Sequence, residues 1–144
     1  MEMQRRILVV DDDPDMVDSI RLVLEANSYR VITSSSAEEG LARARLEKPD
    51  AILLDIMMPN GTEGFQFVWE LRADKDPKVK ATPVLVLTAI HSTTELRFYP
   101  DQSDGTYKAG EYFPVQGFID KPVEPRTLIA QLDKVLQEAR TGQQ

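Results

Sequence analysis

The sequence has no cysteine, one histidine and one tryptophan among its 144 residues. The absence of cysteine excludes a disulfide framework and thiol chemistry, and it is typical of a reducing compartment. No apolar run approaches the roughly 20 residues that a membrane-spanning helix needs. The apolar run that follows the arginines of MEMQRRILVV is also too short for a signal peptide. We therefore expect a cytoplasmic protein without a membrane segment.

Basic residues are scarce relative to acidic ones: 17 lysines and arginines stand against 24 aspartates and glutamates, which gives a formal net charge of −7. The basic residues occur singly or in short pairs, so the chain has no basic stripe for a phosphate backbone, and we expect no direct nucleic-acid binding. The length and the ordinary share of apolar residues predict one globular domain. We place this domain at residues 1–140 and a polar tail or linker stub at residues 141–144.

Short apolar runs alternate with segments of helical periodicity along the chain. The runs cover residues 7–10, 31–33, 51–54, 84–87 and 115–119. Most of them lack polar alternation, which is typical of strands that are covered on both faces. Strand followed by helix, repeated, predicts an α/β fold with a doubly wound parallel sheet.

The segments between these runs predict helices. Asp13 or Asp15 is placed to cap the first helix, and Ser35 or Ser36 the second, which ends near Leu46. We expect Trp69, on the third helix, to be a packing residue rather than a ligand platform. The positions that mark the four helices are Met16, Val17, Ile20, Val23 and Leu24; Ala37, Leu41 and Ala44; Phe65, Val68, Trp69 and Arg72; and Leu128, Ile129, Leu132, Val135 and Leu136.

Polar residues follow four of the predicted strands directly. They are Asp11, Asp12 and Asp13 after the first, Asp55 after the third, Thr88 after the fourth, and Asp120 and Lys121 after the fifth. In doubly wound sheets, ligands bind outside the carboxyl ends of the strands, so these groups should converge. Clustered carboxylates repel one another unless a cation neutralises them, and Mg²⁺ prefers such oxygen ligands. Asp12 and Asp55 are the first candidates as ligands, with Asp11 acting directly or through water.

A magnesium site beside a hydroxyl and an ammonium group indicates phosphoryl transfer, in which charge neutralisation supplies most of the catalysis. Lys121 would neutralise one phosphoryl oxygen and Thr88 would donate a hydrogen bond to another. Asp55, near the centre of the predicted sheet, is the best-placed nucleophile, and its product would be an aspartyl phosphate.

The motifs VVDDD, LLDIMMPNG, VLTA and DKPVEP, in this order and over nearly the whole chain, resemble the receiver domain of two-component response regulators. The resemblance implies a flavodoxin-like sheet of five strands in the order 2-1-3-4-5 with about five helices. It implies that Asp55 is the phosphoacceptor and that the backbone carbonyl of Met57 completes the metal shell of Asp11, Asp12 and Asp55. It further implies that Thr88 and Lys121 stabilise the phosphoryl group, that Thr88 and Phe118 act as the switch, and that the Lys121–Pro122 peptide is cis.

The implied function is a phosphorylation-controlled signalling switch that depends on Mg²⁺. A sensor histidine kinase or a phosphotransfer protein would be the donor, and a downstream protein or an output domain would be the partner. Such a module catalyses only its own phosphoryl transfer and autodephosphorylation and is not otherwise an enzyme. The resemblance is also compatible with a homodimer.

The chain departs from the family pattern in two places. Gly61 and Gly64 indicate one extra residue in the loop after MMP. The segment between Thr88 and Lys121 is longer than usual, so we expect an enlarged or altered region there, with a fourth helix that is short, displaced or replaced by a loop. Within it, His91 is interpreted as a surface or packing residue. The aromatic residues of this segment either form a partner-binding patch or pack it onto the sheet; they are Phe98, Tyr99, Tyr107, Tyr112 and Phe113.

The same residues allow two alternative functions. In a haloacid-dehalogenase-type phosphatase, Asp11 would be the nucleophile and Asp13 the acid/base, but Asp55 would then have no role. We prefer to interpret Asp13 as a helix N-cap. A degenerate receiver that serves only as a phosphorylation-independent docking module is the second alternative.

Overall fold

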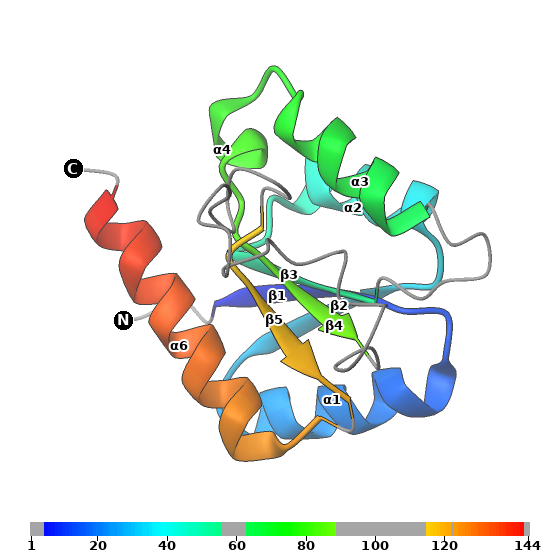
Figure 1. Cartoon of the computed structure of the whole chain (residues 1–144), viewed down its shortest axis with the longest axis vertical. Coiled ribbons are helices and arrows are strands. Elements are labelled where there is room, and N and C mark those ends of the chain that lie inside the picture. The colour runs from blue at the N-terminus through cyan, green and yellow to red at the C-terminus, as the bar shows by residue number, and fades with distance from the viewer. Residues whose placement is uncertain (1–4, 56–62, 89–114, 122, 143–144) are drawn as a thin grey trace, which may run out of the picture.

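A computed structural model gives the structure of the chain and describes residues 5–55, 63–88, 115–121 and 123–142. Along the chain, these residues form β1 (Arg6–Val10), α1 (Pro14–Ala26), β2 (Arg30–Ser34), α2 (Ala37–Glu47), β3 (Ala51–Asp55), α3 (Glu63–Arg72), α4 (Pro77–Lys80), β4 (Val84–Thr88), β5 (Gly117–Asp120) and α6 (Pro125–Gly142). Figure 1 shows their arrangement. The expected alterations in the loop after MMP and in the segment after Thr88, with His91 and the five aromatic residues, lie outside the described residues.

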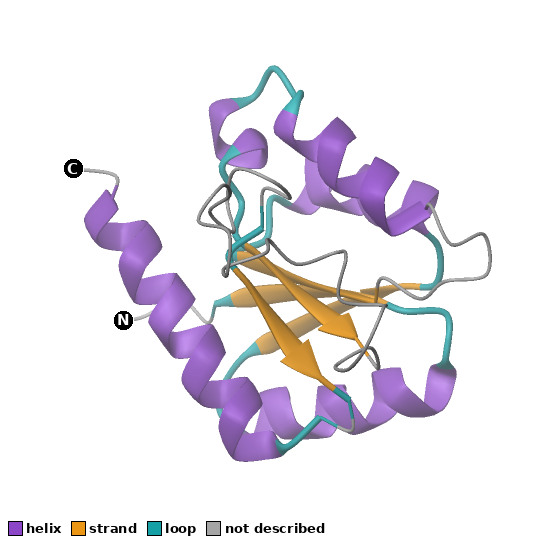
Figure 2. Cartoon of the chain, viewed as in Figure 1, coloured by secondary structure: helices purple, strands orange, loops and turns teal. Residues whose placement is uncertain are grey.

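The strands form one parallel sheet in the order β2-β1-β3-β4-β5 (Figure 2). Every neighbouring pair is parallel. The predicted fold class and strand order are therefore confirmed. Because all strands run in one direction, their carboxyl ends lie along a single edge of the sheet.

Helices cover both faces of the sheet, and each face has its own core. One core joins alternate residues of the central strands to α2, α3 and α4, and the other joins the remaining strand residues to α1 and α6 (Figure 1). The predicted faces of the first, second and last helices are buried or half-buried, as expected. The N-caps are Asp13 for α1 and Ser36 for α2, which resolves the two alternatives that the sequence leaves open.

The third predicted helix differs from expectation in which side chains are buried. Trp69 is 52% exposed, so our expectation that it packs is wrong. Among the described side chains of α3, Val68 is buried as expected, and Phe67 and Leu71, which the sequence pattern did not mark, are buried as well. The start of the last strand also differs, because β5 begins at Gly117 rather than at Val115.

The short helix α4 and the end of α3 are joined to the sheet by the side chain of Arg72. Its guanidinium group donates to the carbonyl oxygens of Lys80 (2.9 Å) and Thr82 (2.6 Å) and to Oε1 of Gln116 (3.1 Å). Gln116 Oε1 also accepts from the backbone N–H of Val84 at 2.7 Å. These contacts fix the starts of β4 and β5, at the edge of the sheet opposite to the carboxyl ends.

Candidate metal and phosphoryl site

The two innermost aspartates are brought together by the pairing of β1 with β3. Val10 and Leu54 are partners in the parallel register, so the next residues, Asp11 and Asp55, reach the same edge. Asp12 follows in the turn that leads to α1. Oxygen atoms of Asp11, Asp12 and Asp55 all lie within 4.8 Å of one another. The sheet topology thus produces the carboxylate cluster that the sequence predicts.

Asp11 and Asp55 are 1% and 3% exposed, whereas Asp12 is exposed to solvent. Asp11 Oδ1 accepts a hydrogen bond from the backbone N–H of Asp13 at 2.9 Å. Asp11 Oδ2 is buried and accepts no hydrogen bond from any residue of the described part of the chain. Burial, together with repulsion from Asp55, raises the pKa of Asp11 to about 6, although the Asp13 N–H and Lys121 act in the opposite direction.

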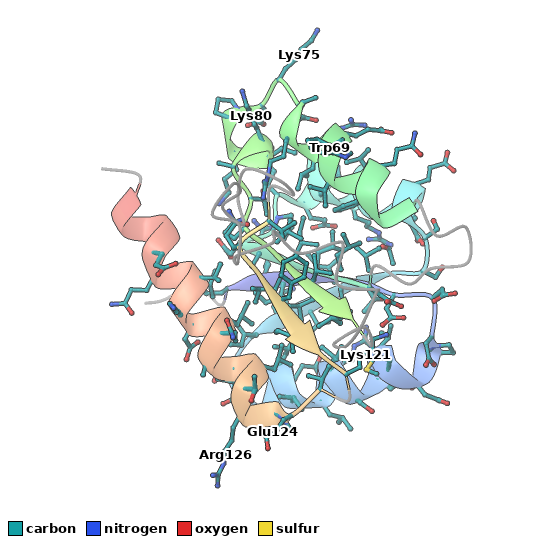
Figure 3. All side chains as sticks on the ribbon, viewed as in Figure 1. Trp69, Lys75, Lys80, Lys121, Glu124 and Arg126 are labelled. Atoms are coloured by element: carbon teal, nitrogen blue, oxygen red, sulfur yellow. The ribbon has the colours of Figure 1, made fainter. Side chains whose placement is uncertain are left out.

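Lys121 supplies the positive charge at this edge of the sheet. It directly follows β5, and its Nζ lies 3.3 Å from Asp55 Oδ1 and 3.8 Å from Asp11 Oδ2. Figure 3 labels Lys121 at the carboxyl end of β5. One ammonium group against three carboxylates leaves a net negative charge in a partly buried place.

This donor set fits a hard divalent cation such as Mg²⁺. Carboxylate oxygens are the ligands that Mg²⁺ prefers, and the ion typically uses one or two of them together with water and phosphate oxygens. The buried Asp11 Oδ2, which lacks a hydrogen-bond partner in the described structure, is the kind of atom that such an ion would satisfy. Asp11, Asp12 and Asp55 are the residues that would hold it.

The remaining predicted site residues are described only in part. Thr88 ends β4 and is in register with Asp120 of β5, but its side chain lies outside the described part of the structure, as do Met57 and Pro122. The roles of Thr88 and Met57 and the cis peptide at Pro122 therefore stay predictions. Phe118 lies on β5 and packs, half-buried, against the core beneath α2 and α3.

The carboxyl end of β2 contributes a wall to the site that our sequence reasoning missed. The carbonyl oxygen of Ser34 accepts the backbone N–H of Asp11 at 3.1 Å. A cavity of about 420 Å³ adjoins Asp11 and Asp12 and is also lined by Ser34, Ser35 and Arg43. Ser34 and Ser35 directly follow the second apolar run, which ends at the same edge of the sheet as the aspartates. Their position in the sequence could therefore have indicated that they lie beside the site.

Asp13 lies next to the cluster but serves the helix. Its Oδ1 accepts the backbone N–H of Asp15 at 3.0 Å, and its side chain is exposed. The interpretation of Asp13 as an N-cap is confirmed. Its carboxylate therefore stabilises the first turn of α1, which carries the partial positive charge of the helix.

Comparison with known proteins agrees with the fold. Residues 7–133 match the family model of the response regulator receiver domain. The chain is 33% identical to Protein PilH of Pseudomonas aeruginosa over 131 residues, which cover 91% of this chain and 97% of PilH. It is 32% identical over 137 residues to the alkaline phosphatase synthesis transcriptional regulatory protein PhoP of Bacillus subtilis, which covers 95% of this chain but only 50% of PhoP.

Solved structures show the same relationship. The chemotaxis response regulator CheY4 of Vibrio cholerae superposes with a TM-score of 0.73 at 30% identity, over 92% of this chain and 99% of that chain. A CheY-like receiver domain protein from Methanospirillum hungatei gives a TM-score of 0.76 at 26% identity, over 97% and 99% of the two chains. The chain therefore belongs to the family of response regulator receiver domains.

Proposed function

We propose that this receiver domain accepts a phosphoryl group on Asp55 and thereby changes its affinity for a partner. The observation that carries the proposal is the convergence of Asp11, Asp12 and Asp55 at one sheet edge, with Lys121 Nζ 3.3 Å from Asp55. A bound Mg²⁺ would offset the negative charge of the carboxylates and of the incoming phosphoryl group.

In the proposed reaction, a carboxylate oxygen of Asp55 attacks the phosphorus of a phosphohistidine. The bond from phosphorus to the imidazole nitrogen of the donor breaks as the bond from phosphorus to Asp55 forms, so the product is an aspartyl phosphate. Lys121, whose Nζ lies 3.3 Å from Asp55, would neutralise one phosphoryl oxygen, and Thr88 would donate a hydrogen bond to another. The donor would be a sensor histidine kinase or a phosphotransfer protein.

The acyl phosphate then biases two conformations that already exist, as phosphorylation switches do. Thr88 would move toward the phosphoryl group and the ring of Phe118 would follow. The half-buried position of Phe118 at the edge strand β5 is compatible with such a movement. The affected surface would bind a downstream protein or an output domain. Among the described residues, none of the helices combines the length and the apolar character that a membrane span requires.

Incubation with acetyl phosphate and Mg²⁺, followed by intact-mass measurement, tests the proposal. We expect a mass gain of one phosphoryl group that hydroxylamine removes and that EDTA prevents. Asp55→Asn should abolish the gain, and Glu25→Gln, which removes an exposed carboxylate of α1, should not change it.

Two outcomes would count against the proposal. No mass gain in the wild-type protein, together with partner binding that beryllofluoride does not change, would favour the phosphorylation-independent docking module. A gain that survives Asp55→Asn would move the acceptor to another residue. The phosphatase alternative does not agree with the family assignment or with the capping role of Asp13.

A further inference from the structure

The surface formed by α2 and α3, which we call the α2–α3 face, has a groove along it. The two helices lie side by side on the same face of the sheet (Figure 1), and their residues share one core. The groove has a volume of about 800 Å³. The buried side chains of Leu41 and Phe67 line the groove. Ala42 also lines it, and its small side chain fills little of the space.

Large apolar side chains are exposed on this face. Leu46 on α2 is 77% exposed and Trp69 on α3 is 52% exposed. In the part of the chain that the structure describes, the only other large apolar residue with such exposure is Leu22 of α1, at 71%. Leu46 and Trp69 are not among the residues that line the groove, but each lies on one of the two helices that form it. Tryptophan is enriched where protein interfaces are most stable.

The distribution of charge indicates what covers the α2–α3 face. The exposed side of α1 and the turn before it are dominated by carboxylates: Asp12, Asp13, Asp15, Asp18 and Glu25. That side would repel another chain of net charge −7. The α2–α3 face instead carries both signs, so a second copy of this chain can approach it without net repulsion.

The two ends of the α2–α3 face have opposite charges available for pairing. Both helices follow strands of a parallel sheet, so they run in the same direction. Glu38 lies in the first turn of α2, and Lys75 lies just beyond the end of α3, where Figure 3 shows it pointing away from the molecule. Neither has an ion-pair partner within the described residues, whereas Arg45 between them is bound to Asp74 at 2.8 Å.

We propose that the α2–α3 face binds the same face of a second copy of the chain in a two-fold symmetric dimer. A two-fold axis across the helices places the start of α2 in one copy against the end of α3 in the other. Glu38 of each copy then pairs with Lys75 of the other, and Leu46 and Trp69 become buried. This dimer does not involve Asp55, so it is independent of the proposed phosphorylation.

Sedimentation equilibrium and tryptophan fluorescence of the full chain test the dimer. Trp69 is the single tryptophan of the sequence, so its emission reports on the α2–α3 face alone. Between about 1 μM and about 1 mM, the range of weak to moderate affinities, we expect a shift from monomer to dimer and a parallel blue shift of the emission. A protein that stays monomeric throughout this range overturns the proposal, even if the α2–α3 face binds a different partner.

Matched variants distinguish this face from other surfaces. Leu46→Ser and Trp69→Ser should each weaken dimerisation at least about tenfold, and Leu22→Ser, an equally exposed leucine on α1, should leave it unchanged. Glu38→Lys and Lys75→Glu should each weaken it, and the double variant should restore it because the pair is only reversed. Two results would show that the chain associates through a different surface. In the first, Leu22→Ser weakens dimerisation and Trp69→Ser does not. In the second, the double charge variant dimerises as weakly as the sum of the two single effects predicts.

Discussion

Lys121 contacts both buried aspartates. Its positive charge should therefore affect metal binding and phosphoryl transfer in opposite directions. In the structure its Nζ lies within 4 Å of Asp11 and Asp55. The ammonium group opposes a divalent cation, because both would be attracted by the same carboxylates and would repel each other. It assists a phosphoryl group, because it neutralises an oxygen that becomes more negative in the transition state.

We therefore predict opposite effects of Lys121→Gln on two measurements. Mg²⁺ affinity, measured by titration calorimetry, should be equal to or greater than that of the wild type, because the cluster loses its positive charge. Phosphorylation by acetyl phosphate should slow by at least about tenfold, the usual range for loss of one group that stabilises transition-state charge. Lys134→Gln on the exposed side of α6 should change neither quantity. A wild-type phosphorylation rate in Lys121→Gln would remove Lys121 from the mechanism.

At the scale of the element, the connection from α1 to β2 contains a residue with strained backbone. Ser28 has a φ of 70°, in the left-handed region that L side chains adopt at a cost. Glycine adopts this conformation without that cost, so we predict that Ser28→Gly raises the free energy of unfolding by about 0.5 kcal/mol. Urea denaturation measures it, and Ser28→Ala, which loses the hydroxyl group but keeps the strain, should not be stabilised. Equal effects of the two substitutions would exclude the backbone explanation.

The Arg72 contacts hold α3, α4 and the starts of β4 and β5 together. Arg72→Leu would leave the carbonyl oxygens of Lys80 and Thr82 and the amide of Gln116 without this donor, so we predict a loss of about 2–4 kcal/mol in the free energy of unfolding. Arg126→Leu, at an exposed position of α6, should change the free energy of unfolding by less than about 0.5 kcal/mol. Because these contacts lie opposite the carboxyl edge, the folded Arg72→Leu protein should keep wild-type Mg²⁺ affinity. A weakened affinity would show that the two edges of the sheet are coupled.

The elements differ in how well the sequence predicts them, and the differences have physical causes. Strands covered on both faces leave unbroken apolar runs, so the sheet was predictable, and its parallel order then places Asp11 and Asp55 together. In α3, Phe67 and Trp69 are both apolar, and the period alone does not say which one faces the sheet. Helix α4 is a single turn, too short for a periodic pattern to show. The Ser34 and Asp13 contacts at the site use backbone atoms, which any residue type supplies.

At the scale of the whole molecule, the carboxylate cluster links stability to pH and to Mg²⁺. The pKa of Asp11 is about 6 in the folded protein, above the ordinary value of 3.8 for an aspartate, so the folded state binds this proton more tightly than the unfolded chain. Stability from Asp11 is therefore fully present below pH 3.8 and is lost as the pH rises through 6. Asp74 and Asp76 have lowered pKa values, through hydrogen bonds from the backbone of Asp76 and from the side chain of Lys48 respectively. Their contributions are lost only in more acidic solution, as the pH falls through their folded pKa values.

We accordingly predict that, without Mg²⁺, the Asp11 contribution to the free energy of unfolding falls by about 1–3 kcal/mol between about pH 4.5 and 7. Subtracting the profile of Asp11→Asn, which cannot titrate there, isolates this contribution in urea denaturation. Saturating Mg²⁺ should reverse the trend, because the ion binds the ionised carboxylates and competes with the proton. At a hundred times its Kd, Mg²⁺ should add about 2.7 kcal/mol near pH 7 and less at pH 5. NaCl at equal ionic strength is the control, since it screens charge without occupying the cluster. Stabilisation by NaCl as great as that by Mg²⁺ would mean that the three aspartates affect stability only through general repulsion and do not form a specific metal site.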